Sequence, residues 1–228
     1  MLKKVGLISL LSVSLMSMNS VELNVNDVDL EAGLNLDIGQ FNSAVEPDTS
    51  FIGVRYLKSD RDYSDFNDSD SYMEASFMRE QAIGENGFYV GIGVKTNYIK
   101  STQFVIASDG NNTTPPADGN TTTPSDSNTT ASSTQNYGGF LSVPFVFEVG
   151  YRLPNYPVDI HASVAFAPQV LAFKEAKAYS EYRVGMEVYI IENAAVSVGY
   201  RSIKLKYQNG NGYNKYNASV YGGFKYRF

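Results

Sequence analysis

Residues 88–99 read FYVGIGVKTNYI, and this stretch decides the fold class that the sequence predicts. Every second residue from Phe88 to Tyr98 is apolar, aromatic or threonine, whereas the positions between them mostly hold glycines and polar residues such as Lys95. Successive side chains of a strand point to opposite faces, so this alternation predicts a strand with one apolar and one polar face. The stretch reaches the roughly 9–11 residues that a tilted strand needs to cross a bilayer, whereas strands of soluble sheets usually stop near five or six.

The same alternation recurs along the chain, at residues 141–152, 158–166, 182–190 and 216–228. The apolar faces are continuous, and the opposite faces are rich in glycine and in charges of both signs. A polar interior with an apolar exterior is the inverse of a soluble barrel and is typical of barrels that face lipid. The predicted fold class is therefore all-β: a transmembrane antiparallel up-and-down β-barrel of eight to ten strands.

The predicted connections alternate in length. The long ones are residues 59–70, 100–137, 167–178 and 207–215, and the short ones are 80–87, 153–157 and 191–193. Long extracellular loops alternating with short periplasmic turns are expected of such barrels. Residues 29–38 also alternate, which would give an odd strand number where bacterial barrels normally have an even one. This segment is either a short closing strand or the partner of residues 21–25.

Aromatic residues crowd the ends of the predicted strands, as in the girdles that mark membrane interfaces. Tyrosine fills this role because the chain contains no tryptophan. We expect one girdle to contain Tyr56, Tyr98, Tyr207 and Tyr216, and the other to contain Phe88, Tyr151, Tyr156, Tyr226 and Phe228. Val164 and Val188 are expected to point into the bilayer near its middle.

The first twenty residues have the layout of a cleavable signal peptide. Lys3 and Lys4 precede an apolar run that is too short for a membrane-spanning helix. We place cleavage after Ser20, with Ser17 as the alternative, so that residues 21–228 form the outer-membrane barrel. The chain has no cysteine for a lipid anchor, a disulfide or a thiolate metal site. Its net charge of −6 argues against a nucleic-acid partner.

Three segments carry a family resemblance: Val25 to Gln40, Val164 to Phe173 and Tyr179 to Ile203. Together and in this order they resemble the YfaZ family of bacterial outer-membrane proteins. The resemblance implies a location in the bacterial outer membrane, reached through the periplasm, and implies no catalytic residues. Phe224, Tyr226 and Phe228 resemble the C-terminal signal that the barrel assembly machinery reads. The expected partners are therefore that machinery during biogenesis and outer-membrane lipid including lipopolysaccharide, and the oligomeric state stays open.

The inward faces hold the residues that could carry chemistry. Asp159, His161 and Ser163 share one strand face and resemble the arrangement of outer-membrane lipid hydrolases, in which histidine activates serine. Neighbours on one strand face lie roughly 6–7 Å apart, so such a relay would be stretched. A polar cluster that faces the lumen is the preferred interpretation, with no catalytic residue. Its predicted members are Glu148, Arg152, Asp159, His161, Arg183, Glu187 and Arg201.

Residues 108–134 form a low-complexity stretch that is predicted to be a disordered extracellular loop. Within it, three copies of the pattern Asp-x-Asn-x-Thr resemble the acceptor of bacterial oligosaccharyltransferases, and a similar Asp-x-Asn-x-Ser pattern occurs in the loop 59–70. The candidate N-glycosylation sites are Asn67, Asn111, Asn120 and Asn128. The acidic loop 59–70 could also bind calcium loosely, but a solvated loop is the preferred interpretation, and no metal or cofactor is expected.

The sequence thus predicts a small outer-membrane barrel with a structural or surface-interaction role, and not an enzyme. A narrow channel for small solutes is the alternative, because a barrel of ten strands would leave a polar passage. An outer-membrane lipid hydrolase is a more distant alternative.

Overall fold

The computed structural model describes most of the chain. The described residues are 19–27, 29–59, 70–100, 103–107, 132–136, 139–208 and 213–228. The strands are β1 (Ser20–Val25), β2 (Asp29–Asp37), β3 (Ser50–Ser59), β4 (Asp70–Ile83), β5 (Phe88–Ile99), β6 (Gln103–Ala107), β7 (Ser132–Asn136), β8 (Phe140–Ser142), β9 (Phe145–Arg152), β10 (Val158–Ala167), β11 (Ala172–Lys174), β12 (Ala176–Ile191), β13 (Ala194–Tyr207) and β14 (Asn214–Arg227). The 3-10 helices are η1 (Ile38–Gln40) and η2 (Gln169–Leu171).

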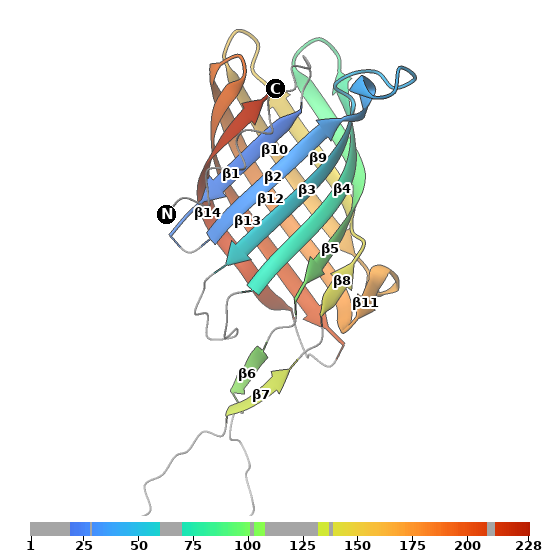
Figure 1. The fold of residues 1–228 in the computed structure, drawn as a ribbon, viewed down its shortest axis with the longest axis vertical. Helices are drawn as coiled ribbons and strands as arrows, with labels where there is room; N and C mark the ends of the chain where they lie inside the picture. Colours follow the sequence, from blue (N-terminus) through green and yellow to red (C-terminus); the bar gives the residue numbers. More distant parts are fainter. Residues whose placement is uncertain are drawn as a thin grey trace, which may run out of the picture.

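The strands close into one antiparallel barrel (Figure 1). Twelve described strands form the sheet, of which β8 and β9 both pair with β5 and make up one barrel strand interrupted at Val143 and Pro144. Proline has no N–H to donate, which accounts for an interruption at this position. Strand β11 pairs only with β8. The described residues therefore form a closed ring of ten antiparallel strands, which confirms the predicted all-β barrel.

Pairing at the N-terminus settles the strand count that the sequence leaves open. Strand β1 pairs with β2 on one side, with Ser20 opposite Asn35, and with β14 on the other, with Ser20 opposite Arg227. Both N-terminal segments are thus barrel strands, and β1 closes the ring. The count of ten is even, as expected for a bacterial single-chain barrel.

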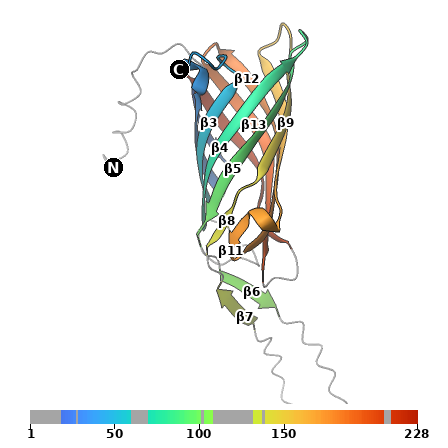
Figure 2. The same cartoon turned by 90° about the vertical axis from the view of Figure 1, so that its right-hand side faces the viewer.

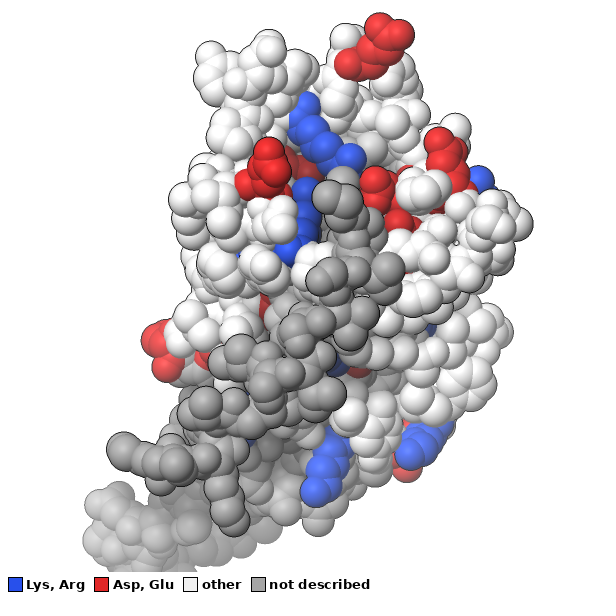
Figure 3. Space-filling view, turned by 45° about the horizontal axis from the view of Figure 1, so that its top comes forward, with Lys and Arg blue, Asp and Glu red and all other residues white. Residues whose placement is uncertain are grey.

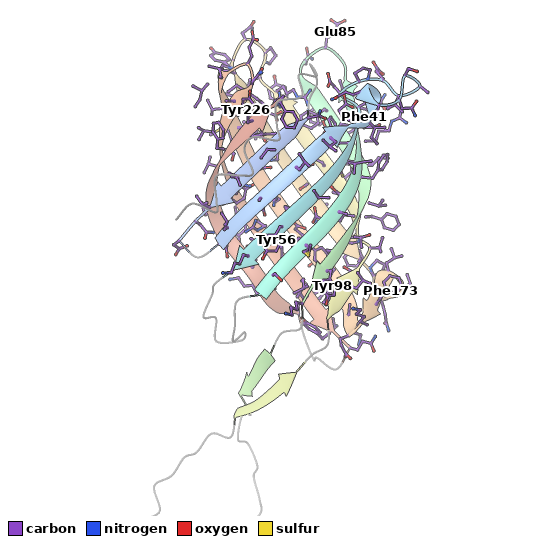
Figure 4. The ribbon with its side chains drawn as sticks, viewed as in Figure 1. Phe41, Tyr56, Glu85, Tyr98, Phe173 and Tyr226 are labelled. Carbon is purple, nitrogen blue, oxygen red and sulfur yellow. The ribbon has the colours of Figure 1, made fainter. Side chains whose placement is uncertain are left out.

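The outer surface of the ring is apolar. Ile92, Phe145 and Val220 are each more than 60% exposed, and the outward positions of every barrel strand carry similar side chains. Figure 4 shows side chains of this kind around the outside of the ring. No helix among the described residues is long and apolar enough to span a membrane. An apolar exterior on a closed ladder is what a spanning structure requires, since every backbone group is paired within the sheet.

The two ends of the barrel differ (Figure 2). One end, here the terminal end, carries Asn19, Phe228 and the connections 38–49, 84–87, 153–157 and 192–193. The other, the long-loop end, carries the connection 168–175 with η2 and β11, and the ribbon formed by β6 and β7. Most of the long connections 59–70, 100–137 and 207–215 lie outside the described residues. Of the predicted low-complexity stretch 108–134, residues 132–134 belong to β7 and the rest lies outside the described residues.

The predicted girdles are partly wrong. Tyr56 and Tyr98 point outward near the long-loop end, and Tyr226 does so at the terminal end (Figure 4). Tyr207 and Tyr216, in contrast, are 0% and 4% exposed and lie inside the barrel. The pairing of β13 with β14 shifts register there, so that Tyr216 is an extra residue and faces inward. A bulge of this kind reverses the alternation that the sequence pattern assumes.

The predicted signal peptide lies outside the described residues up to position 18. Asn19 is buried, its carbonyl accepts a hydrogen bond from the Phe228 N–H at 2.9 Å, and its side chain accepts one from the Asp37 N–H at 3.1 Å. Cleavage after Ser20 would remove these contacts. Cleavage after Ser17, the alternative, would keep them in the mature chain.

Candidate functional site in the barrel interior

An ion-pair network crosses the middle of the barrel. Alternation turns one charged residue after another inward on β2, β3, β4, β5, β12 and β13, so that the charges of distant strands meet inside the ring. Among the described residues the network contains four basic and four acidic side chains: Arg55, Lys95, Arg183 and Arg201 with Asp29, Glu31, Glu74 and Glu181. The numbers balance, as buried charges require.

One half of the network joins Arg55 and Lys95 to Glu74 and Glu181. The Arg55 guanidinium lies 2.5 Å from the nearer Glu74 oxygen and 3.6 Å from Glu181. The Lys95 ammonium lies 2.9 Å from Glu74 and also forms an ion pair with Glu181. Each carboxylate is thus shared by two cations from different strands, so the network ties β3, β4, β5 and β12 together across the lumen.

Glu31 is the centre of the other half. Its carboxylate accepts two hydrogen bonds of 2.9 Å from Arg183 and one from Arg201, and lies 3.8 Å from Arg55. The Asn24 side-chain amide donates to it at 2.9 Å. Glu31 and Arg201 are 2% and 1% exposed, so these charges have no access to bulk water. Three arginines from β3, β12 and β13 therefore converge on one carboxylate from β2.

An apolar layer lies on the long-loop side of the network. Four of its residues lie one inward position from the network: Leu57 and Ile203 come two residues after Arg55 and Arg201, and Tyr72 and Tyr179 come two residues before Glu74 and Glu181. The layer consists of Leu57, Tyr72, Ile99, Phe140, Tyr179, Ile203, Leu205, Tyr207 and Tyr216, all at most 4% exposed. The Phe140 and Tyr207 rings meet edge to face with their centroids 5.4 Å apart. This layer closes the lumen beneath the long loops.

Tyrosine hydroxyls connect the apolar layer to the network. The Tyr72 hydroxyl donates to Glu74, and the Tyr179 hydroxyl donates to Glu181 at 2.7 Å. The two hydroxyls lie 3.0 Å apart. The carboxylate oxygens that pair with Lys95 thus each accept a further hydrogen bond from the side of the apolar layer, and buried polar groups are generally hydrogen-bonded in this way.

A cavity of about 230 Å³ occupies the terminal side of the barrel. Its floor includes the network residues Arg55, Lys95 and Arg183. Its wall and mouth include Glu80, Tyr89, Glu148, Arg152, Asp159, His161, Glu187, Lys225 and Arg227. Figure 3 views the terminal end and shows acidic and basic side chains together on this face. The cavity is therefore a polar recess that ends at the network.

The structure brings the predicted lumen cluster together around this recess. Glu148, Arg152, Asp159, His161, Arg183 and Glu187 line the cavity, and Arg201 belongs to the network beside it. The Arg152 Nε lies 3.3 Å from Asp159, which also accepts a hydrogen bond from the Tyr89 hydroxyl at 3.1 Å. Lys225 donates to Glu187 at 2.8 Å.

Two interior glycines make room for large cavity residues. A Cβ at Gly150 would lie 2.1 Å from the Tyr89 ring, and a Cβ at Gly185 would lie 2.7 Å from Nε2 of His161. The side chains of Tyr89 and His161 therefore each occupy the space next to a glycine of a neighbouring strand. This explains why glycines alternate with charges on the inward faces.

His161 is not engaged in a relay with its neighbours. Its imidazole covers Gly185 on β12, and within the described residues no hydrogen bond joins it to Asp159 or Ser163. Asp159 is instead bound by Arg152 and Tyr89. A serine nucleophile needs a base within hydrogen-bond reach, and the base needs an orienting group. This geometry lacks both contacts.

The sequence-predicted cluster omitted the centre of the network. Glu31, Arg55, Glu74, Lys95 and Glu181 all occupy inward positions, but none was among the candidate residues. The signal was present, because each is a charged residue on the polar face of an alternating segment. Which of these charges meet could not be deduced, since their contacts join strands up to 170 positions apart.

The predicted assembly signal forms the end of β14. Phe224 and Tyr226 point outward and are 46% and 45% exposed, while Phe228 follows the strand. The Arg227 N–H donates to the Asn193 carbonyl at 2.7 Å, and the Phe228 N–H donates to the Asn19 carbonyl. The terminal residues thus bridge β13 and β1. The candidate glycosylation sites Asn67, Asn111, Asn120 and Asn128 lie outside the described residues.

Deleting Phe228 is expected to lower the outer-membrane yield of folded, heat-modifiable protein in cells. The deletion removes the terminal aromatic that resembles the assembly signal, and only one backbone hydrogen bond of the ladder. Refolding of the purified variant in detergent micelles should change little, and Phe228→Tyr should assemble normally. An unchanged cellular yield of the deletion variant would contradict the assignment of this signal.

The closed ladder, the apolar exterior and the polar interior together define an outer-membrane barrel. The C-terminal strands of this barrel also match a known family model. Residues 146–228 match the YfaZ precursor family. The YfaZ match confirms the predicted resemblance for Val164 to Phe173 and Tyr179 to Ile203. Val25 to Gln40 precedes the matched part, so its resemblance stays a prediction.

Similar solved structures include two outer-membrane barrels. The outer membrane protease OmpT from Escherichia coli is 11% identical, with a TM-score of 0.43, over 92% of this chain and 93% of that chain. The β domain of the Bordetella autotransporter BrkA is 15% identical, with a TM-score of 0.40, over 92% of this chain and 97% of that chain. A search of curated proteins finds no match.

Proposed function

We propose that this small outer-membrane barrel has a structural or surface-interaction role and does not conduct solutes. The observation that carries the proposal is the double closure of the lumen by the ion-pair network and the apolar layer. The polar recess ends at Arg55, Lys95 and Arg183, and the apolar layer lies beyond them. In this arrangement the barrel holds its long loops on a rigid support, with those loops on the extracellular side as is usual for such barrels.

The network makes a passage costly. A solute that crosses the barrel would have to separate ion pairs such as Arg55 with Glu74, both nearly buried. Removing one partner of a buried pair typically destabilises a protein by about 3–5 kcal/mol. The solute would also have to displace the rings of the apolar layer, such as those of Phe140 and Tyr207, which are fully buried. These two requirements favour a closed barrel over the narrow channel.

The interior geometry also favours a protein without enzymatic activity. His161 and Ser163 line an aqueous recess inside the barrel, whereas a lipid substrate would reach the outer surface. Within the part of the chain that the structure describes, no hydrogen bond joins the imidazole to Ser163. A lipid hydrolase would need these two side chains on the lipid-facing side and a hydrogen bond between them.

Planar-bilayer recording tests the proposal. We expect the purified wild-type protein to give no stable conductance steps. The test variant combines four substitutions. Lys95→Ala and Glu181→Ala remove one charge pair of the network, and Tyr179→Ala and Tyr207→Ala remove two rings of the apolar layer. This four-residue variant should produce conductance steps. Stable steps of similar size in the wild type and in this four-residue variant would contradict the closed barrel.

A further inference from the structure

A group of lysines and tyrosines marks the outer surface of β12, β13 and β14 near the long-loop end. We define the rim patch as Tyr182, Tyr200, Lys204, Lys206 and Lys215. Lys204 and Lys206 are half-buried, Lys215 is exposed, and the two tyrosine rings lie 6.1 Å apart. All five residues point away from the lumen, where Ile203, Leu205 and Tyr207 occupy the intervening inward positions.

Register places the rim patch at the edge of the apolar band. On β13 the outward residues run Val196, Val198, Tyr200, Ser202, Lys204 and Lys206 toward the long-loop end. The adjacent strand β12 also changes along its length: the outward residues Val188 and Met186 give way to Tyr182 and Ser180. Apolar, aromatic and then basic residues follow one another as in a membrane interface, where tyrosine lies at the headgroup level. The lysines therefore lie where lipid headgroups are expected.

Lys204 is paired directly with Lys215 across β13 and β14. Like charges opposite each other repel within a sheet, so an anion that contacts both ammonium groups would relieve this repulsion. Lys206 lies two residues further along β13 and adds a third positive charge. Among the described residues, neither Lys204 nor Lys206 forms an ion pair with a carboxylate.

Tyrosine rings hold two of the ammonium groups in place. The Lys204 Nζ lies 5.9 Å from the centroid of the Tyr182 ring, and the Lys206 Nζ lies 5.5 Å from that of Tyr213. Cations within about 6 Å of an aromatic face are attracted to it. The rim patch is thus a cationic surface with partly ordered donors, next to a surface that acyl chains cover.

We propose that the rim patch binds the phosphate groups of a phosphorylated glycolipid, such as lipopolysaccharide, in the leaflet at the long-loop end. The three lysines supply the charge that phosphate requires, and lysine is a well-established phosphate binder. The apolar residues below, such as Val184 and Val198, are in position to contact the acyl chains of the same molecule. Charge and apolar surface thus match the two parts of one amphipathic ligand.

Binding of diphosphorylated lipid A to the purified protein in detergent micelles tests this proposal, measured by native mass spectrometry. The test variant is Lys204→Gln with Lys206→Gln and Lys215→Gln. The matched control is Lys58→Gln with Lys100→Gln and Lys174→Gln, which removes the same charge from exposed positions at the same end. The control includes a lysine that also lies over a tyrosine, since Lys174 Nζ is 4.8 Å from the Tyr98 ring centroid.

We expect the test variant to bind on the order of a hundredfold more weakly than the wild type, because each lysine near an anionic surface contributes separately. The control should bind within about threefold of the wild type. The test positions are on the surface, so the variant should fold. A second measurement needs only the wild-type protein. Its affinity should fall as ionic strength rises and should fall for dephosphorylated lipid A.

Three results would overturn the proposal. The test variant and the control could lose affinity equally, which would make the effect one of net charge. Dephosphorylated lipid A could bind as tightly, which would leave only apolar contact. Inorganic phosphate at the same concentration could occupy the protein as fully, which would indicate a site for a free anion and not for lipid.

Discussion

Glu31→Gln is expected to lower the free energy of unfolding by about 3–5 kcal/mol, the range seen when one partner of a buried ion pair is removed. Glu31 accepts hydrogen bonds from Arg183 and Arg201 and lies near Arg55, and the exchange leaves these guanidinium groups short of one negative charge. Glutamine keeps the volume of the side chain, so a cavity cannot explain the loss. Urea-induced unfolding in phospholipid vesicles measures it.

The control for this prediction is Glu85→Gln. Glu85 lies on the exposed turn between β4 and β5, at the terminal end (Figure 4), and the exchange removes the same charge. Surface substitutions usually change stability by less than about 0.5 kcal/mol. If Glu31→Gln proved as mild as Glu85→Gln, the network would not hold the interior as described.

Val188→Arg is expected to destabilise the barrel by about 2–4 kcal/mol if the side chain lies near the bilayer midplane, with a smaller effect toward the interface. Val188 points outward between Val196 and Val158, the first residue of β10, so an arginine there would lie on the apolar outer surface toward the terminal end. The measurement is again unfolding from phospholipid vesicles.

Two variants control for the size and charge of arginine. Glu192→Arg lies on the exposed turn after β12 and should have little effect. Ser163→Arg points into the polar recess and should depend on the charges there rather than on lipid. Equal losses in Val188→Arg and Glu192→Arg would contradict the assignment of the lipid face.

The fold could be predicted because its main determinant is local. In β5 the outward Val94 and the inward Lys95 are neighbours in sequence, and a period of two is enough to separate lipid from lumen. The strand count was open because β1 is too short for its alternation to identify it as a membrane-spanning strand. Its role follows from pairing with β14, a contact between opposite ends of the chain.

The site was less predictable, for two physical reasons. The alternation of β14 predicted Tyr216 on the outside, but the bulge at this residue turns its side chain toward Tyr72, with ring centroids 6.2 Å apart. A bulge depends on the packing around it, and the alternation of apolar and polar residues along the sequence does not reveal its position. The partners of Glu31, likewise, follow from the circumference of the closed ring and not from any spacing along the chain.

The pairing of Ser20 with Arg227 also determines when this protein can be complete. β1 and β14 are the first and the last described strands of the ring along the chain, so one edge of β1 stays unpaired until β14 is in place. Bringing the two ends together carries the loop-closure entropy of nearly the whole chain, and such non-local pairing slows folding. Until that step an exposed edge could pair with another chain. Closing the ring therefore removes the exposed edges of β1 and β14 together.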